Sequence, residues 1–374
     1  MFGIRPVLLL LSLLSSLAAA QPPAVPPQRL ALLARGVNLS HWLWLTGPRS
    51  GHARLEFITP DDLAGLRSAG LTHVRLPFEP ADLWDPAEHA LKGSGLLDLR
   101  LAIERCLAAE LAVIVDAHPT QAPWSAPDDP QGLAELERFW SALARDLSAT
   151  EPDRVFLEIL NEPHDLKDPA LWPAAQARIA AAIRAAAPRH TIIATGDDWS
   201  NIPGLLRLKP LPDPNIVYTF HFYEPHNFTH QGATWGWPPW KHMKGLPYPS
   251  TPETLATIAA TIEDKQAHDA TLAYGKERWN AAEIRARIAK AADWSRTNRV
   301  PIYCGEFGVY TAFSPRDARI AWLHDTAAAL AESNIGWAMW DYTGGFALAP
   351  GDPGKRTIDT DLAKAIGLSP ATPK

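Results

Sequence analysis

Eight short apolar segments rich in β-forming residues recur along the chain, and segments with helical periodicity lie between them. Most of the eight are continuously apolar rather than alternating, which is typical of parallel strands covered on both faces. A single alternation of eight strands with helices predicts an α/β fold, a (β/α)8 TIM barrel. The predicted strands are Arg35–Leu39, His73–Phe78, Ala112–Asp116, Val155–Leu160, Thr191–Thr195, Ile216–Phe222, Pro301–Cys304 and Gly336–Trp340.

A doubly wound open sheet is the structural alternative to the barrel. Such a sheet normally carries a G-x-G-x-x-G phosphate turn after its first strand, and no such turn follows Arg35–Leu39. The helices have readable ends: Thr59 is a suitable N-cap, Pro60 suits the first helical position, and Gly70 ends that helix. An apolar stripe over residues 133–147 predicts a further helix, with Trp140 in the core.

The chain has 374 residues, and a prior of about 150 residues per domain suggests two or three domains. The strand pattern instead predicts one catalytic domain over residues 31–368, with an extended connection after the sixth strand at 224–299. The first part of this connection is loop-like and rich in Trp, Pro, Gly and His. Its later part predicts helices at Pro252–Ala267 and Ala281–Thr297.

The first twenty residues have the pattern of a secretory signal peptide. Arg5 precedes the apolar run Val7–Leu14, and three alanines end the segment at Ala20. An uncleaved N-terminal anchor is the alternative. We expect export to the periplasm or the extracellular space, with no membrane contact after cleavage. Residues 21–30 predict a proline-rich extended leader, and residues 369–374 a frayed tail.

Charge and cysteine content exclude several classes of protein. The formal net charge is −6, and no long Lys/Arg run is present, so nucleic-acid binding is not expected. Two cysteines do not make a disulfide scaffold, and both lie in apolar patterns. We therefore expect Cys106 and Cys304 to be buried free thiols in a monomeric protein.

Polar side chains collect where the predicted strands end, which is where barrel enzymes place their active sites. Glu162 and Glu306 follow or end different strands, so their carboxyl groups can converge across the barrel mouth. Glycoside hydrolysis uses such a pair, separated by about 5–5.5 Å for retention and about 6.5–9.5 Å for inversion. The other polar or aromatic residues at these ends are Arg75, Asp116, His118, Asn161, His221, Tyr223, Trp340 and Asp341.

Four segments carry a family resemblance over roughly residues 35–345. Residues 157–163 (LEILNEP), 303–308 (YCGEFG), 35–39 (RGVNL) and 221–223 (HFY) resemble motifs of glycoside hydrolase family 5, the cellulase A family. The resemblance implies a retaining double displacement. It implies that Glu162 is the general acid/base and Glu306 the nucleophile.

The resemblance also implies supporting roles for neighbouring residues. Arg75 would keep Glu306 ionised, and Tyr223 would donate a hydrogen bond to it. Asn161 would bind the sugar 2-hydroxyl, a contact that strengthens in the transition state. His118 and His221 would hold hydroxyls or the catalytic carboxyls, and Trp340 would form the apolar floor under the reacting sugar.

Each of these residues also has a structural alternative. Glu162 and Glu306 could be salt-bridge partners at the barrel mouth, and Arg75 could be purely structural. Pro119 follows His118 where family members often have another polar residue. Asp116 is left outside catalysis. Glu158, on the Glu162 side of its strand, is interpreted as a buried partner of Arg75 or of another base.

Tryptophan is unusually frequent, with 15 residues against 7 tyrosines and 11 phenylalanines. Trp199 follows the fifth strand and could line a sugar subsite. Three tryptophans in the long connection predict either stacking platforms or a lid on the cleft, or else a satellite core that holds the loop. They are Trp235, Trp237 and Trp240; Trp42 and Trp44, after the first strand, present the same choice.

Other chemistries have weaker support. His226 and His230 are four residues apart, but Pro225 and the loop context do not favour a metal site, and no cofactor motif is present. Asn227 begins an N-x-T glycosylation pattern that often occurs by chance, and no G-x-S-x-G elbow of a serine hydrolase occurs.

The sequence therefore predicts a secreted retaining β-glycosidase that acts on a β-glucan polysaccharide or oligosaccharide. The leading candidate is an endo-β-1,4-glucanase. The rivals are β-1,3-glucanase, β-glucosidase and β-mannanase activities, and a catalytically silent carbohydrate-binding barrel is the alternative of a different class.

Overall fold

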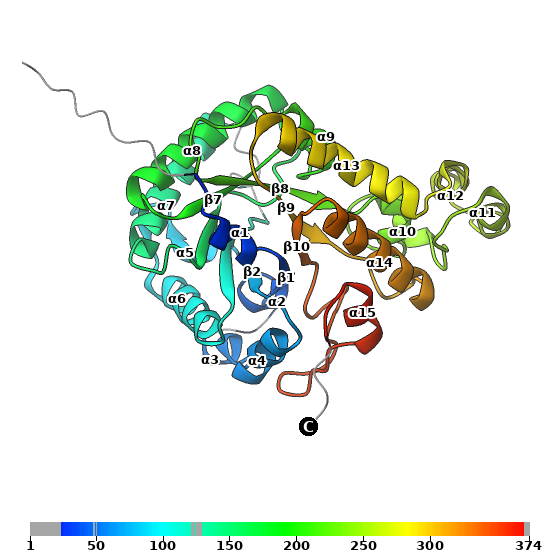
Figure 1. Cartoon of the computed structure of the whole chain (residues 1–374), viewed down its shortest axis with the longest axis horizontal. Helices are drawn as coiled ribbons and strands as arrows, with labels where there is room; N and C mark the ends of the chain where they lie inside the picture. The colour runs from blue at the N-terminus through cyan, green and yellow to red at the C-terminus, as the bar shows by residue number, and fades with distance from the viewer. Residues whose placement is uncertain (1–23, 48, 50, 121–123, 125–128, 370–374) are drawn as a thin grey trace, which may run out of the picture.

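Eight parallel strands close into a barrel in a computed structural model, which describes residues 24–369 except 48, 50, 121–123 and 125–128. The strand order around the barrel is β1-β10-β9-β8-β7-β6-β5-β2, so each barrel strand pairs with its neighbours in the chain and the last pairs with the first (Figure 1). The (β/α)8 prediction is confirmed. The barrel strands are β1 Arg35–Asn38, β2 His73–Phe78, β5 Ala112–Ala117, β6 Val155–Glu158, β7 Thr191–Thr195, β8 Ile216–Phe222, β9 Ile302–Phe307 and β10 Gly336–Met339.

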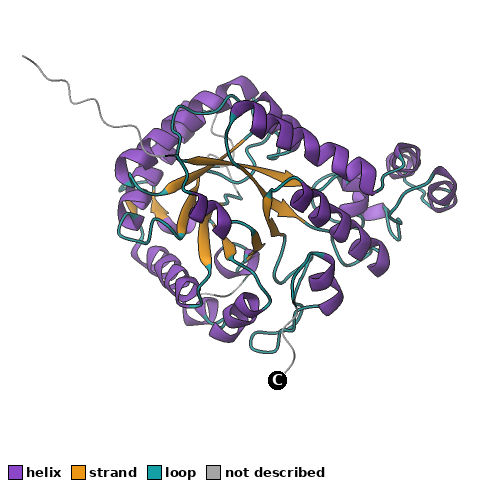
Figure 2. Cartoon of the chain, in the orientation of Figure 1, coloured by secondary structure: helices purple, strands orange, loops and turns teal. Residues whose placement is uncertain are grey.

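Helices surround the strands as an outer layer (Figure 2). A small hairpin, β3 Trp84–Asp85 with β4 Ala90–Leu91, lies outside the barrel sheet. The helices are α1 Pro27–Leu32, α2 Ser40–Leu43, α3 Gly51–Leu55, α4 Pro60–Ser68, α5 Pro80–Leu83, α6 Gly93–Ala108, α7 Pro130–Leu147, α8 Trp172–Ala186, α9 Ile202–Arg207, α10 His226–Thr229, α11 Pro252–Ala259, α12 Lys265–Glu277, α13 Ala281–Asn298, α14 Arg316–Glu332 and α15 Thr360–Ala365, with 3-10 turns η1 Pro169–Leu171 and η2 Pro238–His242.

Local sequence explains where several of these helices begin and pack. Thr59 and Asp62 form a capping box at the start of α4, because each side chain accepts a hydrogen bond from the other's backbone N–H. The stripe on α7 is buried, and Trp140 is fully buried with its indole donating to the Ile159 carbonyl. Cys106 and Cys304 are free and buried, as predicted.

The N-terminal leader differs from its prediction where the structure describes it. Residues 27–30 begin helix α1 rather than forming an extended leader outside the fold, and Val25 is buried. Arg29 donates to the carbonyl of Arg189 and the hydroxyl of Thr191 at 2.7 and 3.0 Å. Val25 and Leu33 pack with residues inside the barrel strands, so this segment closes the amino-terminal end of the barrel. The signal-peptide prediction lies outside the described residues.

The connection after β8 is also more structured than predicted. The single helix expected at 252–267 is two helices, α11 and α12, which pack against each other and project from the barrel (Figure 1). The expected loop at 224–250 contains the short helix α10 and the turn η2. The helix expected at 281–297 is α13.

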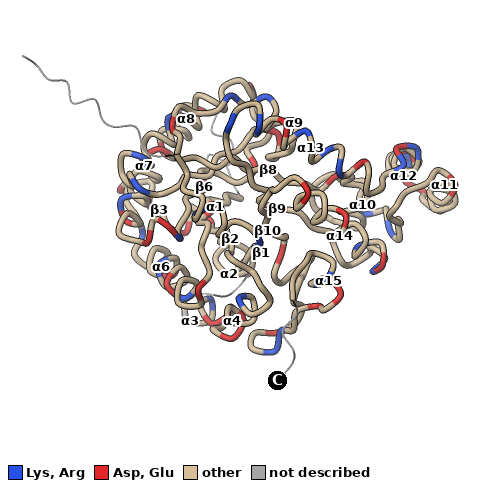
Figure 3. The backbone as a smooth tube through the Cα atoms, viewed as in Figure 1, with Lys and Arg blue, Asp and Glu red and all other residues tan. Residues whose placement is uncertain are grey.

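Charged residues lie mainly on the outer helices and loops, with both signs interspersed (Figure 3). Within the described part of the chain, no helix is both long enough and apolar enough to cross a bilayer.

Candidate active site

The carboxyl ends of the barrel strands bring the predicted site residues together. Arg75 lies in β2 and Asp116 in β5, while Glu162 follows β6. His221 and Glu306 are register partners on β8 and β9, and the pairing shifts at Phe220/His221 because β9 has an extra residue there, Gly305. A Cβ on Gly305 would lie 2.6 Å from the Thr219 hydroxyl and 3.0 Å from the His221 ring, so only glycine fits.

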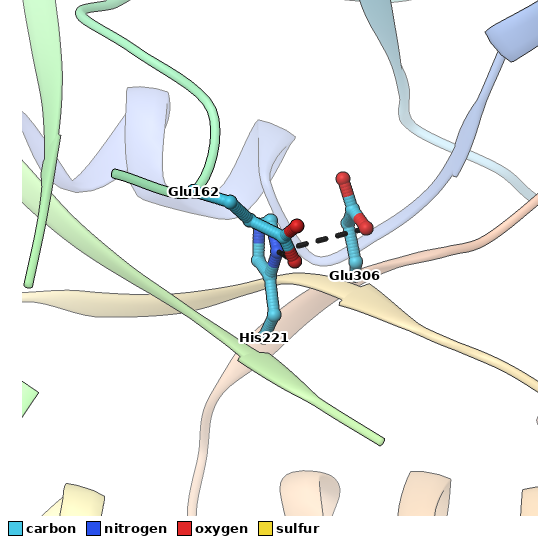
Figure 4. A group of neighbouring side chains, drawn as sticks. All are labelled: Glu162, His221 and Glu306. Atoms are coloured by element: carbon cyan, nitrogen blue, oxygen red, sulfur yellow. Dashed lines mark hydrogen bonds and ion pairs between the residues drawn. The ribbon is translucent and has the colours of Figure 1, made fainter. Parts of the chain in front are cut away.

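The two candidate catalytic carboxylates lie near each other, and the ring of His221 lies against the carboxyl group of Glu162 (Figure 4). Nδ1 of His221 is 2.7 Å from Oε1 of Glu162 and 3.6 Å from Oε2 of Glu306. One oxygen from each carboxylate and one ring nitrogen all lie within 4.8 Å of one another. These atoms lie closer together than the carboxyl groups of an inverting pair, which are about 6.5–9.5 Å apart.

The same three groups also have the chemistry of metal ligands. Both oxygens of Glu306 already accept hydrogen bonds, and Nδ1 of His221 faces Glu162. His226 and His230 stack on each other with ring centroids 5.5 Å apart and lie against aromatic rings rather than carboxylates.

Glu306 is held as an acceptor on both oxygens. Nη1 of Arg75 donates to Oε1 at 2.6 Å, and the hydroxyl of Tyr223 donates to Oε2 at 2.9 Å. Burial raises the pKa of Glu306, whereas His221 and Arg75 lower it. The hydrogen bonds from Arg75 and Tyr223 favour its ionised form, whereas burial and the neighbouring carboxyl group of Glu162 raise its pKa.

Arg75 is a fully buried hub beneath the site. Its Nε and Nη2 form a bidentate pair with Glu158, both at 2.8 Å, and its Nη1 also donates to Oδ1 of Asn38 at 3.0 Å. Burial opposes its charge, but the carboxylates of Asp116, Glu158 and Glu306 hold the pKa of Arg75 well above its usual value. Glu158 was expected to pair with Arg75 or with another basic residue, and the structure shows the pair with Arg75.

Glu162 has the electrostatics of a proton donor. Its side chain is only 19% exposed, and burial raises the pKa of the carboxyl to about 7 although Arg75 and His164 act in the opposite direction. A group with this pKa retains its proton through much of the neutral range. Its backbone has φ +41°, a conformation that side chains other than glycine rarely adopt and that is often found at functional sites.

An aromatic wall lies beside the carboxylates. The ring of Trp340, directly after β10, stacks on His118 with centroids 5.6 Å apart. The ring centroid of Trp44 is 4.0 Å from that of His118 and 5.8 Å from that of Trp340. Trp42, in contrast, is fully buried in the core. The structure thus separates the two tryptophans that the sequence left together, with Trp44 at the site.

The other tryptophans also separate. Trp199 is 48% exposed and stacks on His164 at 3.5 Å, next to Glu162. Trp235 and Trp237 are 47% and 39% exposed. Trp240 instead packs into the loop, donating from Nε1 to Asn227 at 3.2 Å.

Asn38 is a site residue that the sequence analysis did not single out. Its Oδ1 accepts from Arg75, and its Nδ2 donates to the carbonyls of Gly305 and Met339. A polar residue at the end of the first barrel strand was the available signal. Nothing in the sequence indicated which of several such residues would reach Arg75.

Comparison with known proteins connects this geometry to one family. The family model "Cellulase (glycosyl hydrolase family 5)" matches residues 40–345. Endoglucanase 3 of Fibrobacter succinogenes is 26% identical over 359 residues, which cover 90% of this chain but 53% of that protein. Endoglucanase C of Acetivibrio thermocellus is 27% identical over 317 residues, which cover 82% of this chain and 90% of that protein.

Solved structures show the same fold. Cel5A from Thermotoga maritima, solved in complex with cellobiose as a mutant form, superposes with a TM-score of 0.76 at 24% identity, covering 92% of this chain and 99% of that one. The same enzyme in complex with mannotriose gives a TM-score of 0.73, at 24% identity, over 91% of this chain and 99% of that one. With the family model matching most of its length, the chain belongs to the cellulase family, glycosyl hydrolase family 5.

Proposed function

We propose that this protein is a retaining β-glucan hydrolase, with endo-β-1,4-glucanase as its leading activity. One observation carries the proposal: an oxygen of Glu162 and one of Glu306 lie within 4.8 Å of each other, and Glu306 accepts hydrogen bonds from both Arg75 and Tyr223, which favour its ionised form. The two carboxyl groups thus have different environments, which is what an acid and a nucleophile require.

In the first step, an oxygen of Glu306 attacks the anomeric carbon. Glu162 transfers its proton to the glycosidic oxygen as that C–O bond breaks, and the leaving sugar departs as an alcohol. The negative charge of Glu306 falls as the ester bond forms. Arg75 and Tyr223 hold the carboxylate in place before attack, so little reorganisation is needed in the transition state.

In the second step, Glu162 acts as a base, since its proton has left with the alcohol. It takes a proton from water, the water oxygen attacks the anomeric carbon, and the bond to Glu306 breaks. Two inversions give net retention. His221, 2.7 Å from Glu162, keeps that carboxyl group directed at the glycosidic oxygen in both steps.

The remaining residues bind the sugar. Asn161 supplies the hydrogen bond to the 2-hydroxyl, and His118 lies beside it. Trp340 and Trp44 offer flat apolar faces to the pyranose ring. Trp199 stacks on His164, which contacts the carbonyl of Glu162, so Trp199 serves the leaving-group side that Glu162 protonates.

The substrate class rests on the relatives. Both curated proteins described above are named endoglucanases, which favours β-1,4-glucan. The mannotriose complex of Thermotoga maritima Cel5A makes β-mannan the second candidate. β-1,3-Glucanase and β-glucosidase activities remain rivals, and a silent sugar-binding barrel is the proposal of a different class.

One experiment tests the proposal. The purified protein is incubated with carboxymethylcellulose, β-1,3-glucan, β-mannan and cellohexaose, and products are resolved by size and, by NMR, by anomer. We expect internal cleavage of β-1,4-glucan with β-anomers formed first. Initial α-anomers would overturn retention, cleavage of mannan alone would overturn the glucanase assignment, and binding without cleavage would establish the silent barrel.

We further propose that the protein is exported after removal of residues 1–20 and acts as a monomer in the periplasm or outside the cell. The support is the charged start, the short apolar run and the A-x-A pattern. N-terminal sequencing of protein from each cell fraction, with size-exclusion chromatography, tests this. An intact Met1 in the membrane fraction would establish the anchor instead.

A further inference from the structure

A closed ring of three hydrogen bonds and one ion pair joins Arg75, Asn161, His118 and Asp116. Nη2 of Arg75 donates to Oδ1 of Asn161 at 2.8 Å, and Nδ2 of Asn161 is 3.0 Å from Nε2 of His118. Nδ1 of His118 is 2.8 Å from Oδ2 of Asp116. The same Oδ2 is 3.1 Å from Nη2 of Arg75, which closes the ring.

Arg75 determines the direction of every bond in this ring. A guanidinium can only donate, so the Asn161 atom facing it must be the carbonyl oxygen, and the amide nitrogen faces His118. Nε2 of His118 must then accept. Burial lowers the pKa of His118 to about 3, so its imidazole is neutral. The single N–H proton of the imidazole lies on Nδ1, which donates to Asp116.

Asp116 is not needed as the main counter-charge of Arg75. Glu158 already pairs with the guanidinium through two bonds of 2.8 Å. Asp116 is fully buried, and among the described residues its Oδ1 has no hydrogen-bond partner, although an unpartnered buried oxygen is unfavourable. The well-directed contact of its carboxyl group is the acceptor that it offers to His118.

We propose that Asp116 is a positioning residue for the glycosidase reaction proposed above, on which this inference rests. It keeps the proton of His118 on Nδ1, so that Nε2 holds one N–H of Asn161 and the other N–H remains for the sugar 2-hydroxyl. Without this acceptor, His118 can carry its proton on Nε2. Two donors would then face each other at 3.0 Å, and Asn161 would turn away from the sugar.

The test removes the acceptor and measures the contact with the 2-hydroxyl. Asp116→Leu has similar size but no acceptor, and Asp116→Asn restores an acceptor oxygen without the charge. Each is assayed on an aryl β-cellobioside and on its analogue lacking the 2-hydroxyl of the reacting sugar. We expect Asp116→Leu to lower kcat about 10- to 100-fold with little change in KM, as for other residues that orient a functional histidine.

The discriminating readout is the ratio of kcat on the two substrates. Wild type should strongly prefer the substrate with the 2-hydroxyl, Asp116→Leu should lose about tenfold of that preference, and Asp116→Asn should recover most of it. Tyr303→Phe is the matched control, because it removes a buried hydrogen bond to His73 in the same barrel without touching this ring. The control should keep the wild-type ratio.

A second measurement does not depend on any variant folding. Nitrogen-15 NMR of the wild-type protein, with the His118 signal assigned, reports which ring nitrogen carries the proton. A protonated Nδ1 supports the proposal, and a protonated Nε2 overturns it. An unchanged kcat ratio in folded Asp116→Leu also overturns it. Absence of glycosidase activity in the wild type would instead overturn the proposed function, so the two failures are distinguishable.

Discussion

At the scale of single residues, we expect no neighbouring side chain to replace Glu306 as the nucleophile. Changing Glu306→Gln keeps the shape and the buried position but replaces the nucleophilic carboxylate with a neutral amide. We expect hydrolysis of β-glucan to fall by about 10⁴-fold or more, a loss typical when a nucleophile is removed, with sugar binding largely retained. Reducing-sugar release and calorimetric binding of cellotetraose measure the two effects. Equal sugar release by wild type and variant would exclude this residue as nucleophile.

The pH dependence of activity follows from the two carboxyl groups. Glu306 must be ionised, so activity rises with pH at the acid side. Glu162 must be protonated, and its pKa of about 7 means that activity falls as pH rises through the neutral range. The pH profile of kcat/KM should therefore be bell-shaped.

The alkaline limb of that profile belongs to Glu162 alone. In Glu162→Gln, we expect this limb to disappear and the first step to become dependent on the leaving group, so aryl glycosides with good leaving groups retain more activity than cellotetraose. A wild-type profile without an alkaline limb, or one unchanged in the variant, would remove Glu162 from the acid role.

At the scale of elements, helix α1 closes the barrel from below through Arg29. We expect Arg29→Ala to lower the free energy of unfolding by about 1–3 kcal/mol, because the carbonyl of Arg189 and the hydroxyl of Thr191 lose their donor. Urea denaturation measures the change. Arg67→Ala is the control: its pair with Glu110 is exposed and 3.7 Å long, so its effect should stay within about 0.5 kcal/mol. Equal effects would mean that α1 contributes no more than a surface helix.

In the Trp-rich loop after β8, Trp240 packs as the satellite core predicts, and the platform remains a prediction for Trp235. Trp240 is the internal anchor of the loop, whereas Trp235 is exposed and held at 4.7 Å by the ring of Tyr310. We expect Trp235→Ala to raise the Kd for cellohexaose about 2- to 10-fold without changing stability, and Trp240→Ala to destabilise the protein.

Calorimetry with cellohexaose and cellobiose separates these effects, since a distal platform contributes only to the longer chain. Leu171→Ala, which removes an equally exposed apolar side chain on the turn η1, should change neither Kd. The platform interpretation fails if Trp235→Ala binds cellohexaose like the wild type.

At the scale of the whole molecule, stability does not depend on a covalent cross-link. Cys106 on α6 and Cys304 on β9 are free and buried, and burial raises the pKa of both thiols. We expect the same unfolding midpoint with and without reductant, and reaction of both thiols with a disulfide reagent only after unfolding. A midpoint that falls in reductant would show a disulfide and contradict this expectation.

The fold could be predicted because its signal is local. Each barrel strand is a short apolar run, and each overlaps its prediction; three, including His73–Phe78, match at both ends. Three strands end earlier than predicted, such as Gly336–Met339 against a predicted Gly336–Trp340, because the chain leaves the sheet there to form the site. The prediction of an extended leader was wrong. Proline content favours extension, but the burial of Val25 and the hydrogen bonds of Arg29 stabilise helix α1.

The sequence by itself determined the barrel, the order of the motifs and the two glutamates, because hydrophobic periodicity and strand-end residues are properties of neighbours along the chain. Only the tertiary structure decided the distance between Glu162 and Glu306, the hub role of Arg75 and the ring that includes Asp116. Those features join side chains from different strands. Strand register, the bulge at Gly305 and the exclusion of water set their spacing and pKa values, and none of these can be read from any one segment.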